Sequence, residues 1–325
     1  MSGLRRLILF FIDKCNYLIK KMSNFNKELK FCDMNLRKIG LSLLGAAAVI
    51  PASAQIFYKI EGNGLEKPSY LFGTHHLAPI SVVEENNVPE YFEETRQVVG
   101  EIDLTLDPMT IAMAMQSHMM APPDSTLSKI ISPEDYVIIN EEFKKYTPIP
   151  GTDLSMFETM KPMVVSTLVT VSVMSEKMGG FDAENQLDSY FMKKAKEEGK
   201  KVTPLETPEF QASVLYDSTP ISYQAEGLVE ILKNPQQIFE SSEKLNEAYF
   251  NGDLETMYSL SEEEDSHPEF MVALLDRRNA DWLTKLPSIM EDSPAFIAVG
   301  ALHLAGDKGL VKGLRDLGYT VTPLP

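Results

Sequence analysis

Two short stretches decide the fold, Ser69-Tyr70-Leu71-Phe72-Gly73-Thr74-His75-His76-Leu77-Ala78 and Ala295-Phe296-Ile297-Ala298-Val299-Gly300-Ala301-Leu302-His303-Leu304-Ala305-Gly306. Each is an apolar run of strand length that is followed by Gly-x-x-His and then by Leu-Ala. Short apolar runs rich in β-branched and aromatic residues that end at glycine indicate buried strands. Each histidine then comes just after a strand, where open α/β sheets build their sites. We therefore expect His76 and His303 to meet at one edge of one sheet system.

A second, weaker internal similarity surrounds the sequence Val-Thr-Pro-Leu. Residues 193–206 and 309–325 both read as a helix, a glycine and a short strand that carries this sequence. The long middle of the chain has mainly helical spacing of its apolar residues and contains no linker. The sequence therefore predicts one α/β domain over residues 55–325, with two matching strand–Gly-x-x-His units in a central sheet system and a large helical middle.

The first 54 residues are predicted to lie outside that domain. A basic segment at 34–38 and an apolar segment at 39–49 precede Ala52-Ser53-Ala54, which has the form of a cleavage site. The apolar segment is too short to span a bilayer comfortably, so we interpret residues 34–54 as a cleaved signal peptide and not as a membrane anchor. Residues 1–33 are then an N-terminal extension, either a gene-start artefact or part of an unusually long leader. The predicted product is periplasmic or secreted and has no stable membrane span.

Charge and cysteine content exclude several classes of function. The chain carries 47 acidic and 30 basic side chains, a net charge of −17. Residues 1–54 hold more basic than acidic side chains, so the predicted domain is more acidic still, which argues against nucleic acid or anionic lipid as a partner. Both cysteines, Cys15 and Cys32, precede residue 55. The domain therefore has no cysteine nucleophile, disulfide or cysteine metal site.

The histidines are the first candidates for chemistry. His76 and His303 hold matching places in matching motifs, and imidazole is a common ligand of zinc and other divalent ions. For either histidine alone, the alternative is a structural residue of the core. His75 is expected to be a supporting or exposed residue, while His118 and His267 have no motif around them.

Two acidic positions follow apolar runs. Glu101 lies in Val98-Val99-Gly100-Glu101-Ile102, within a strand that we predict over residues 97–104. A carboxylate there is costly unless it is paired or bound to a metal ion. Asp103 would share a strand face with Glu101, and a solvated strand edge is the alternative explanation for both. Glu206 follows the predicted strand 202–205 and is a reserve metal ligand.

Arg278 is the candidate cation. It lies in a predicted helix next to Arg277 and four residues before Trp282, the single tryptophan of the chain. An arginine could stabilise an oxyanion or bind a carboxylate. Surface ion pairs with the many acidic residues are the alternative.

At these residues the sequence resembles the TraB/GumN family, which is related to the Tiki metalloproteases. The resemblance covers nearly all of residues 56–325. It rests on these segments: Tyr70-Leu71-Phe72-Gly73-Thr74-His75-His76, Val99-Gly100-Glu101, Leu205-Glu206-Thr207, Arg278-Asn279-x-x-Trp282, Val299-Gly300-Ala301-Leu302-His303-Leu304-Ala305-Gly306 and Leu317-Gly318-Tyr319. The resemblance implies an α/β fold like that of the erythromycin esterase and ChaN-like proteins. It also implies a metal-dependent hydrolytic site, which falls here on His76, His303, Glu101 and Arg278.

These observations predict an exported metal-dependent hydrolase, foremost a peptidase that acts on peptides or small amide or ester substrates. A divalent metal ion held by His76, His303 and Glu101 would lower the pKa of a bound water to ~7 and polarise the scissile carbonyl. Arg278 would stabilise the oxyanion, and Glu101 would be the general base if it is not a ligand. The main alternative is a non-catalytic periplasmic binding protein that sequesters a peptide or small molecule. Haem or iron binding through the same histidines is a further alternative, by analogy with ChaN-like proteins.

The cleavage motif gives a direct prediction about the N-terminus. Because Ala52-Ser53-Ala54 has the form that signal peptidases cut, protein purified from the exported fraction should begin at Gln55. Mass spectrometry of the N-terminal peptide measures this directly, with cyclised Gln55 counted as the same product. An intact Met1 in that fraction would contradict the prediction.

Overall fold

The computed structural model of the protein describes residues 56–324 except 86, 148–150, 178–185 and 265–266. The described residues all belong to one compact unit of the chain, Ser53–Pro325. The predicted extension, signal peptide and start at Gln55 lie outside them. No helix in the described part of the chain combines the length and the apolar character that a membrane span needs.

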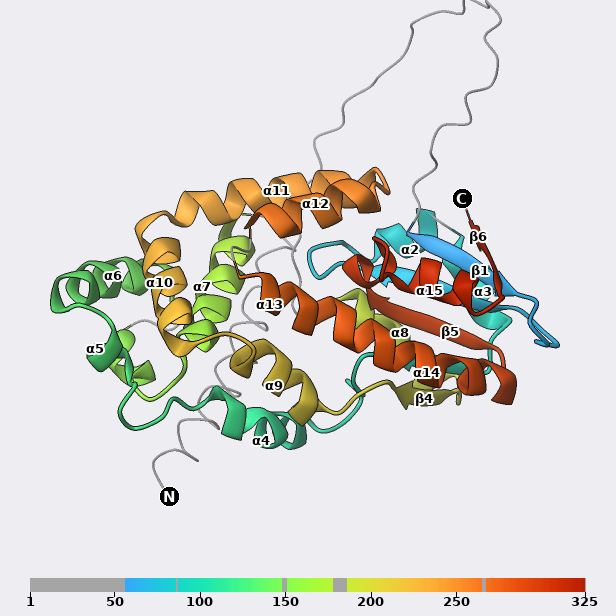
Figure 1. Ribbon diagram of the computed structural model, residues 1–325, viewed down its shortest axis with the longest axis horizontal. Coiled ribbons are helices and arrows are strands. Elements are labelled where there is room, and N and C mark those ends of the chain that lie inside the picture. The colour runs from blue at the N-terminus through green and yellow to red at the C-terminus, as the bar shows by residue number, and fades with distance from the viewer. Residues whose placement is uncertain (1–55, 86, 148–150, 178–185, 265–266, 325) are drawn as a thin grey trace, which may run out of the picture. The chain divides into compact units, whose positions relative to one another are not determined.

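A six-stranded sheet forms the centre of this unit (Figure 1), with the strand order β4-β3-β5-β2-β1-β6. The strands are β1 (Phe57–Glu61), β2 (Ser69–Thr74), β3 (Gln97–Gly100), β4 (Lys201–Pro204), β5 (Ala295–Gly300) and β6 (Thr320–Pro323). Strands β4, β3, β5 and β2 are parallel neighbours, whereas β1 runs antiparallel to both β2 and β6. Because parallel strands end at the same edge, the residues that follow these four strands come together there.

Helices cover both faces of the sheet and extend beyond one end of it, so the prediction of an α/β fold with a helical middle is confirmed. The helices are α2 (Ser81–Glu85), α3 (Val88–Glu93), α4 (Pro108–Met119), α5 (Leu127–Ile130), α6 (Pro133–Tyr146), α7 (Pro162–Lys177), α8 (Leu187–Glu197), α9 (Pro208–Asp217), α10 (Ile221–Lys233), α11 (Pro235–Phe250), α12 (Leu254–Glu264), α13 (Pro268–Met271), α14 (Arg277–Asp292) and α15 (Leu310–Asp316). Shorter turns are η1 (Leu154–Phe157), the π-helical η2 (Val272–Asp276) and η3 (Ala301–Leu304).

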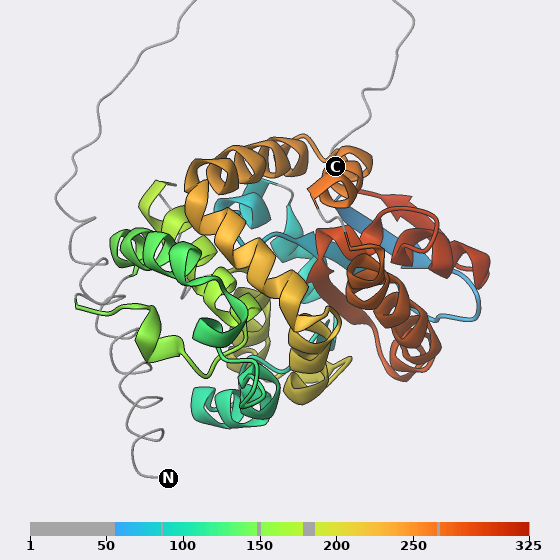
Figure 2. The same cartoon turned by 60° about the vertical axis from the view of Figure 1, so that its left-hand side comes forward.

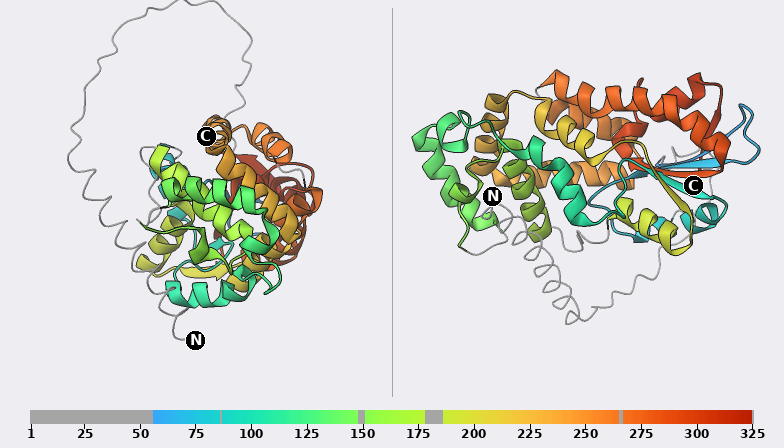
Figure 3. Two further views of the ribbon diagram at one scale, coloured as in Figure 1. Left: turned by 90° about the vertical axis from the view of Figure 1, so that its left-hand side faces the viewer. Right: turned by 90° about the horizontal axis from the view of Figure 1, so that it is seen from below.

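The helices form two groups around the sheet. Helices α14 and α15 lie on one face and α8 lies on the other (Figures 1 and 3). Helices α4 to α7, α9 and α10 gather beyond the end of the sheet (Figure 1), and α10 packs against both α6 and α7 (Figure 2). The edge at which the parallel strands end therefore lies next to this second group of helices.

An aromatic cluster holds α8 against the sheet. The ring centroid of Phe191 on α8 lies 4.6 Å from that of Phe296 on β5 and 5.3 Å from that of Phe72 on β2. All three side chains are fully buried. Fully burying a side chain of this kind contributes about 1.5–3 kcal/mol to the stability of the fold, so these contacts hold α8 firmly against the sheet.

The two Gly-x-x-His strands lie side by side, as expected from the sequence. Thr74 on β2 pairs with Gly300 on β5 in parallel register. A Cβ atom added at Gly73 would lie only 3.0 Å from the Cα atom of Ala301 in η3. The glycine of the first motif therefore lets the backbone of the second motif pack directly against it.

The predicted strand over residues 97–104 is too long. Strand β3 ends at Gly100, and the Asp103 carboxylate then accepts hydrogen bonds from the backbone N–H and the hydroxyl of Thr105, which makes a turn. Local side-chain bonds of this kind compete with the strand ladder. Glu101 therefore lies just past the end of β3, and the prediction that Glu101 and Asp103 share one strand face is wrong.

The predicted repeat around Val-Thr-Pro is present in the structure. The two Val-Thr-Pro segments form β4 and β6, and each follows a helix that ends at a glycine with positive φ, 70° at Gly199 and 94° at Gly318. The weak internal similarity thus corresponds to a repeated local structure.

The contact at Gly73 predicts the effect of a single methyl group. Gly73→Ala should destabilise the protein by about 1–3 kcal/mol, because the new Cβ meets backbone atoms of Ala301 that cannot move aside easily. Gly227→Ala in helix α10 is the matched control, since nothing lies within 4 Å of its added Cβ. That variant should be more stable than the wild type by about 0.5–1 kcal/mol. Urea unfolding measures both, and equal stability of the two variants would contradict the packing argument.

Candidate functional site

Four adjacent strand ends supply the polar side chains of the candidate site. Glu206 follows β4, Glu101 follows β3, His303 lies in η3 after β5, and His76 follows β2. Arg278, in the first turn of α14, reaches the same edge from the covering helix. Sequence segments more than two hundred residues apart therefore meet because the sheet places them side by side.

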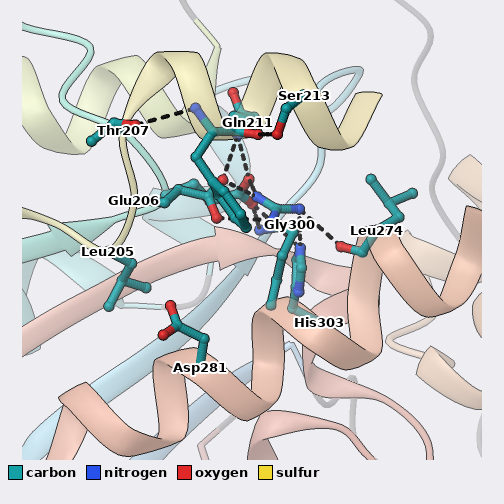
Figure 4. Close-up of polar contacts among 12 residues, drawn as sticks. Leu205, Glu206, Thr207, Gln211, Ser213, Leu274, Asp281, Gly300 and His303 are labelled. Atoms are coloured by element: carbon teal, nitrogen blue, oxygen red, sulfur yellow. Dashed lines mark hydrogen bonds and ion pairs between the residues drawn. The ribbon is translucent and has the colours of Figure 1, made fainter. Parts of the chain in front are cut away.

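Arg278 is the centre of the cluster, and its side chain is only 3% exposed. Its Nε donates to Glu206 Oε2 at 3.0 Å, and its Nη2 donates to Glu206 Oε1 and to Glu101 Oε2, both at 2.6 Å. Its Nη1 donates to His303 Nε2 and to the Leu274 carbonyl, both at 3.0 Å (Figure 4). A guanidinium has five N–H groups, so every donor of Arg278 already has an acceptor.

The local backbone explains how Arg278 reaches these partners. The preceding segment η2 is π-helical, and the backbone N–H of Arg277 bonds to the carbonyl of Val272, five residues earlier. Such wide turns occur often at functional sites. Within η2, the Leu274 carbonyl accepts from the Arg278 side chain, and the guanidinium carbon lies 4.7 Å from the Trp282 ring centroid. The helix turn and the tryptophan together hold the guanidinium in one place.

The contacts of His303 fix its tautomer. Because arginine stays protonated, its Nη1 must donate and the Nε2 of His303 must accept. The Nδ1–H of His303 then donates to Asn279 Oδ1 at 2.7 Å, while the amide nitrogen of Asn279 donates to the carbonyls of His303 and Lys308. Burial lowers the pKa of His303 to about 3, so the imidazole is neutral at pH 7. Neither ring nitrogen of His303 is left free.

The two glutamates differ in their access to solvent. The side chain of Glu101 is 20% exposed, whereas that of Glu206 is 2% exposed. Gln211 on α9 donates to both carboxylates, and the Gly300 N–H donates to Glu101 Oε1 at 2.9 Å. Burial would raise the pKa of Glu101, but the charge of Arg278 and the hydrogen bonds from Arg278 and from the Gly300 N–H hold it below its usual range. Burial raises the pKa of Glu206, and Arg278 opposes this shift.

His76 lies at the exposed rim of the cluster. Its side chain is 73% exposed, and its Nδ1 lies 3.4 Å from Asp188 Oδ2. The Asp188 carboxylate raises the pKa of His76, and the charge of Glu101 adds to this effect. Among the residues that the structure describes, no hydrogen bond joins His76 to Arg278 or its partners. The neighbouring His75 is half-buried and its Nε2 lies 2.6 Å from Asn246 Oδ1.

The structure thus brings Glu101, Glu206, Arg278 and His303 into one network, with His76 on the adjoining strand end. Glu206 is a central member and not only a reserve. His118 pairs with Asp217 and the ring of His267 lies against Tyr223, both outside the network. Sequence reasoning missed three supporting residues: Gln211, Asn279 and Asp188. Only Asn279 had a signal, because it belongs to the quoted segment Arg278-Asn279-x-x-Trp282.

The predicted metal ligands have suitable donor types but are not arranged around an ion. Imidazole nitrogen and carboxylate oxygen are usual ligands of zinc. However, His303 has no free nitrogen, and both oxygens of Glu101 accept hydrogen bonds. In the described part of the chain, no three histidine, cysteine, aspartate or glutamate side chains form a group that could hold an ion. As arranged, these residues do not fit a resident metal ion, and we derive no catalytic step through one.

The fold and site define an α/β protein with a buried carboxylate–guanidinium–imidazole centre at the ends of parallel strands. The model of the TraB/PrgY/gumN family matches residues 56–323, and the chain belongs to this family. The chain is also similar to a protein of Danio rerio described as "Metalloprotease TIKI1", with 23% identity over 309 residues that cover 80% of this chain. The matched part spans 62% of the length of that relative. No solved structure matches significantly.

The buried neutral histidine predicts a pH dependence of stability. In the unfolded chain His303 takes up a proton below its ordinary pKa of 6.5, whereas in the folded protein its pKa is about 3. The unfolded state therefore binds more protons in this range, and the free energy of unfolding should fall as the pH drops from 6.5 to about 5. His303→Gln, which keeps an acceptor for Arg278, should lose stability less steeply over that range.

The choice of range separates His303 from Glu101 and His76, whereas His75, whose pKa burial lowers to about 4, contributes over the same range and is accounted for by comparing the slopes of wild type and His303→Gln. The carboxylate of Glu101 contributes to the pH dependence mainly below its ordinary pKa of 4.5, and His76, with its raised pKa, contributes above 6.5. His118→Gln, outside the network, is the matched control. Urea unfolding at several pH values measures the slopes, and an unchanged slope in His303→Gln would show that the buried imidazole is not the cause.

Proposed function

We propose that this protein is a hydrolase that cleaves a peptide bond, or a related amide or ester bond, at the strand edge formed by Glu101 and His76. Family membership and the similarity to a protein described as a metalloprotease support a hydrolase. The observation that carries the proposal is the difference in exposure within one polar cluster. Glu206, Arg278 and His303 are nearly fully buried, and Glu101 and His76 are the members that a substrate can reach.

Glu101 is the general base in this proposal. It is ionised at pH 7, and a water molecule at its exposed side would be within reach of the carboxylate. A carboxylate whose pKa lies below its usual range is a weak base. A substrate that covers Glu101 removes solvent from it, and this desolvation raises its pKa towards the range in which it accepts a proton readily. Substrate binding and base strength are thereby coupled.

His76 is the acid. With its raised pKa it carries a proton at pH 7, and its charge lies close enough to Glu101 for each to affect the other. A protonated imidazole can stabilise the oxyanion of the tetrahedral intermediate and then donate a proton to the leaving amine. This assigns to His76 the role that we predicted for Arg278 from the sequence. Arg278 has no donor free for an oxyanion, so its part is to hold Glu101 and Glu206 in place.

The proposal also includes metal dependence, export and a preference among substrates. Metal dependence is suggested by the description of the relative, and it requires that Arg278 release His303 Nε2 and Glu101 before an ion can bind them. A periplasmic or secreted location follows from the predicted signal peptide alone. The acidic composition of the chain favours neutral or basic peptides over acidic ones.

A binding protein is the second candidate. It is favoured by the complete hydrogen bonding of Arg278, which keeps the centre intact without a substrate. In that case the protein would retain a peptide and release it unchanged. The two candidates differ in whether covalent products appear.

A digest of a peptide library, read by mass spectrometry, tests the proposal. Glu101→Gln and His76→Asn should each lower turnover roughly 10²-fold or more, because each removes one proton-transfer group. The double variant should be little worse than either single variant, since the two groups act in one step. His118→Gln is the matched control and should keep wild-type turnover. Peptide binding without any cleavage by the wild type would instead support the binding protein.

The same digest, repeated after chelation and with metal analysis of the protein, decides the part of an ion. Turnover that falls with chelator and returns with an added divalent ion would support the metal-dependent form of the proposal. Unchanged turnover would assign hydrolysis to Glu101 and His76 alone. Full turnover in Glu101→Gln and His76→Asn would contradict the proposed site in either form.

A further inference from the structure

Asp188 is a buried carboxylate that neither the sequence prediction nor the proposed reaction uses. It lies in the first turn of helix α8, and its side chain is only 13% exposed. The same helix carries Phe191, which docks against Phe296 and Phe72 of the sheet. The position of Asp188 is therefore set by the packing of α8 and not by a flexible loop.

The contacts of Asp188 join it to both ends of one motif segment. The Thr74 hydroxyl donates to Asp188 Oδ1 at 2.6 Å, and Asp188 Oδ2 lies 3.4 Å from the Nδ1 of His76. Within the described residues, Oδ2 is buried and makes no hydrogen bond. His75, between Thr74 and His76, turns the other way, towards Asn246 and the ring of Tyr249. A buried carboxylate oxygen is costly without a donor, and the imidazole of His76 lies within reach of a small side-chain rotation.

We propose that Asp188 is a positioning residue for His76, which receives the Nδ1–H of the imidazole and so directs Nε2 towards the substrate. This inference rests on the proposed function and extends it by one residue. The hydrogen bond that one ring nitrogen makes decides which nitrogen is available for chemistry. Thr74 holds Oδ1 and thereby leaves Oδ2 for His76. The Gly-Thr-His-His segment therefore supplies both the reactive imidazole and the hydroxyl that fixes its partner.

A purely structural role for Asp188 would have different consequences. An acidic residue in the first turn stabilises a helix through the helix dipole, and its loss would lower the stability of α8 without altering the imidazole. The two roles are separated by asking which ring nitrogen of His76 is protonated, and by asking whether the change appears in kcat or only in the melting temperature.

Asp188→Asn is the test variant. The Thr74 hydroxyl needs an acceptor, so the amide oxygen should stay at the Oδ1 position and the NH2 group should face His76. The neutral ring should then carry its proton on Nε2 and accept at Nδ1. Nitrogen-15 NMR of the histidine ring should show this change of tautomer at high pH. We expect kcat to fall about 10- to 100-fold, as for other partners that orient a functional histidine, with little change in KM.

Asp217→Asn is the matched control, because Asp217 is likewise an aspartate beside the Nδ1 of a histidine, His118, at 2.5 Å but outside the site. It should leave kcat unchanged. An unchanged His76 tautomer together with wild-type kcat in Asp188→Asn would overturn the inference. If the wild type shows no turnover at all, the proposed function fails, but the NMR comparison still tests the role of Asp188. A variant that keeps its tautomer and loses only thermal stability would assign Asp188 to the helix alone.

Discussion

The buried guanidinium of Arg278 is the interaction on which the rest of the site depends. It binds acceptors that follow β3, β4 and β5, and it is anchored in the turn before α14. Breaking a buried pair by removing one partner typically costs about 3–5 kcal/mol, because the other charge is left uncompensated. Lysine has three donors in place of five and cannot replace the planar fork. The centre is therefore a single unit, and its members cannot be exchanged one at a time.

Arg278 and its partners also determine the ionisation and the orientation of the other groups in the site. Arg278 keeps Glu101 ionised, fixes the tautomer of His303 and balances the buried charge of Glu206. None of its own donors is left over. The groups that reach solvent, Glu101 and His76, each have a partner from another element. Gln211 on α9 donates to Glu101, and the Asp188 carboxylate on α8 lies 3.4 Å from His76. In the proposed reaction, the groups at the surface of the site are thus positioned by residues of the surrounding helices.

The sequence predicted the ends of β2, β4 and β5 because their signal is local, but it placed the end of β3 too late. An apolar run that ends at glycine marks a strand exit, and parallel neighbours bring such exits to one edge, so His76 and His303 could be expected at that edge without a structure. The contact partners could not be predicted, because they depend on how helices dock. Asp188 meets Thr74 across 114 positions and Gln211 meets Glu101 across 110, and neither has a motif around it. Likewise, only the structure shows that every donor of Arg278 already has an acceptor. The sequence therefore led to an oxyanion-binding role for Arg278, for which the structure leaves no donor.

The repeated Val-Thr-Pro segments form the two outermost strands, β4 and β6, of the sheet. An outermost strand exposes unpaired backbone groups on which a strand of another molecule can add. Both of these strands have only four residues and end in proline, at Pro204 and Pro323, and proline has no N–H to contribute to a ladder. The repeat therefore acts at both sides as a barrier against growth of the sheet. In the proposed function, the edge at the strand ends stays open to extended peptides while the flanks of the sheet do not take up such chains.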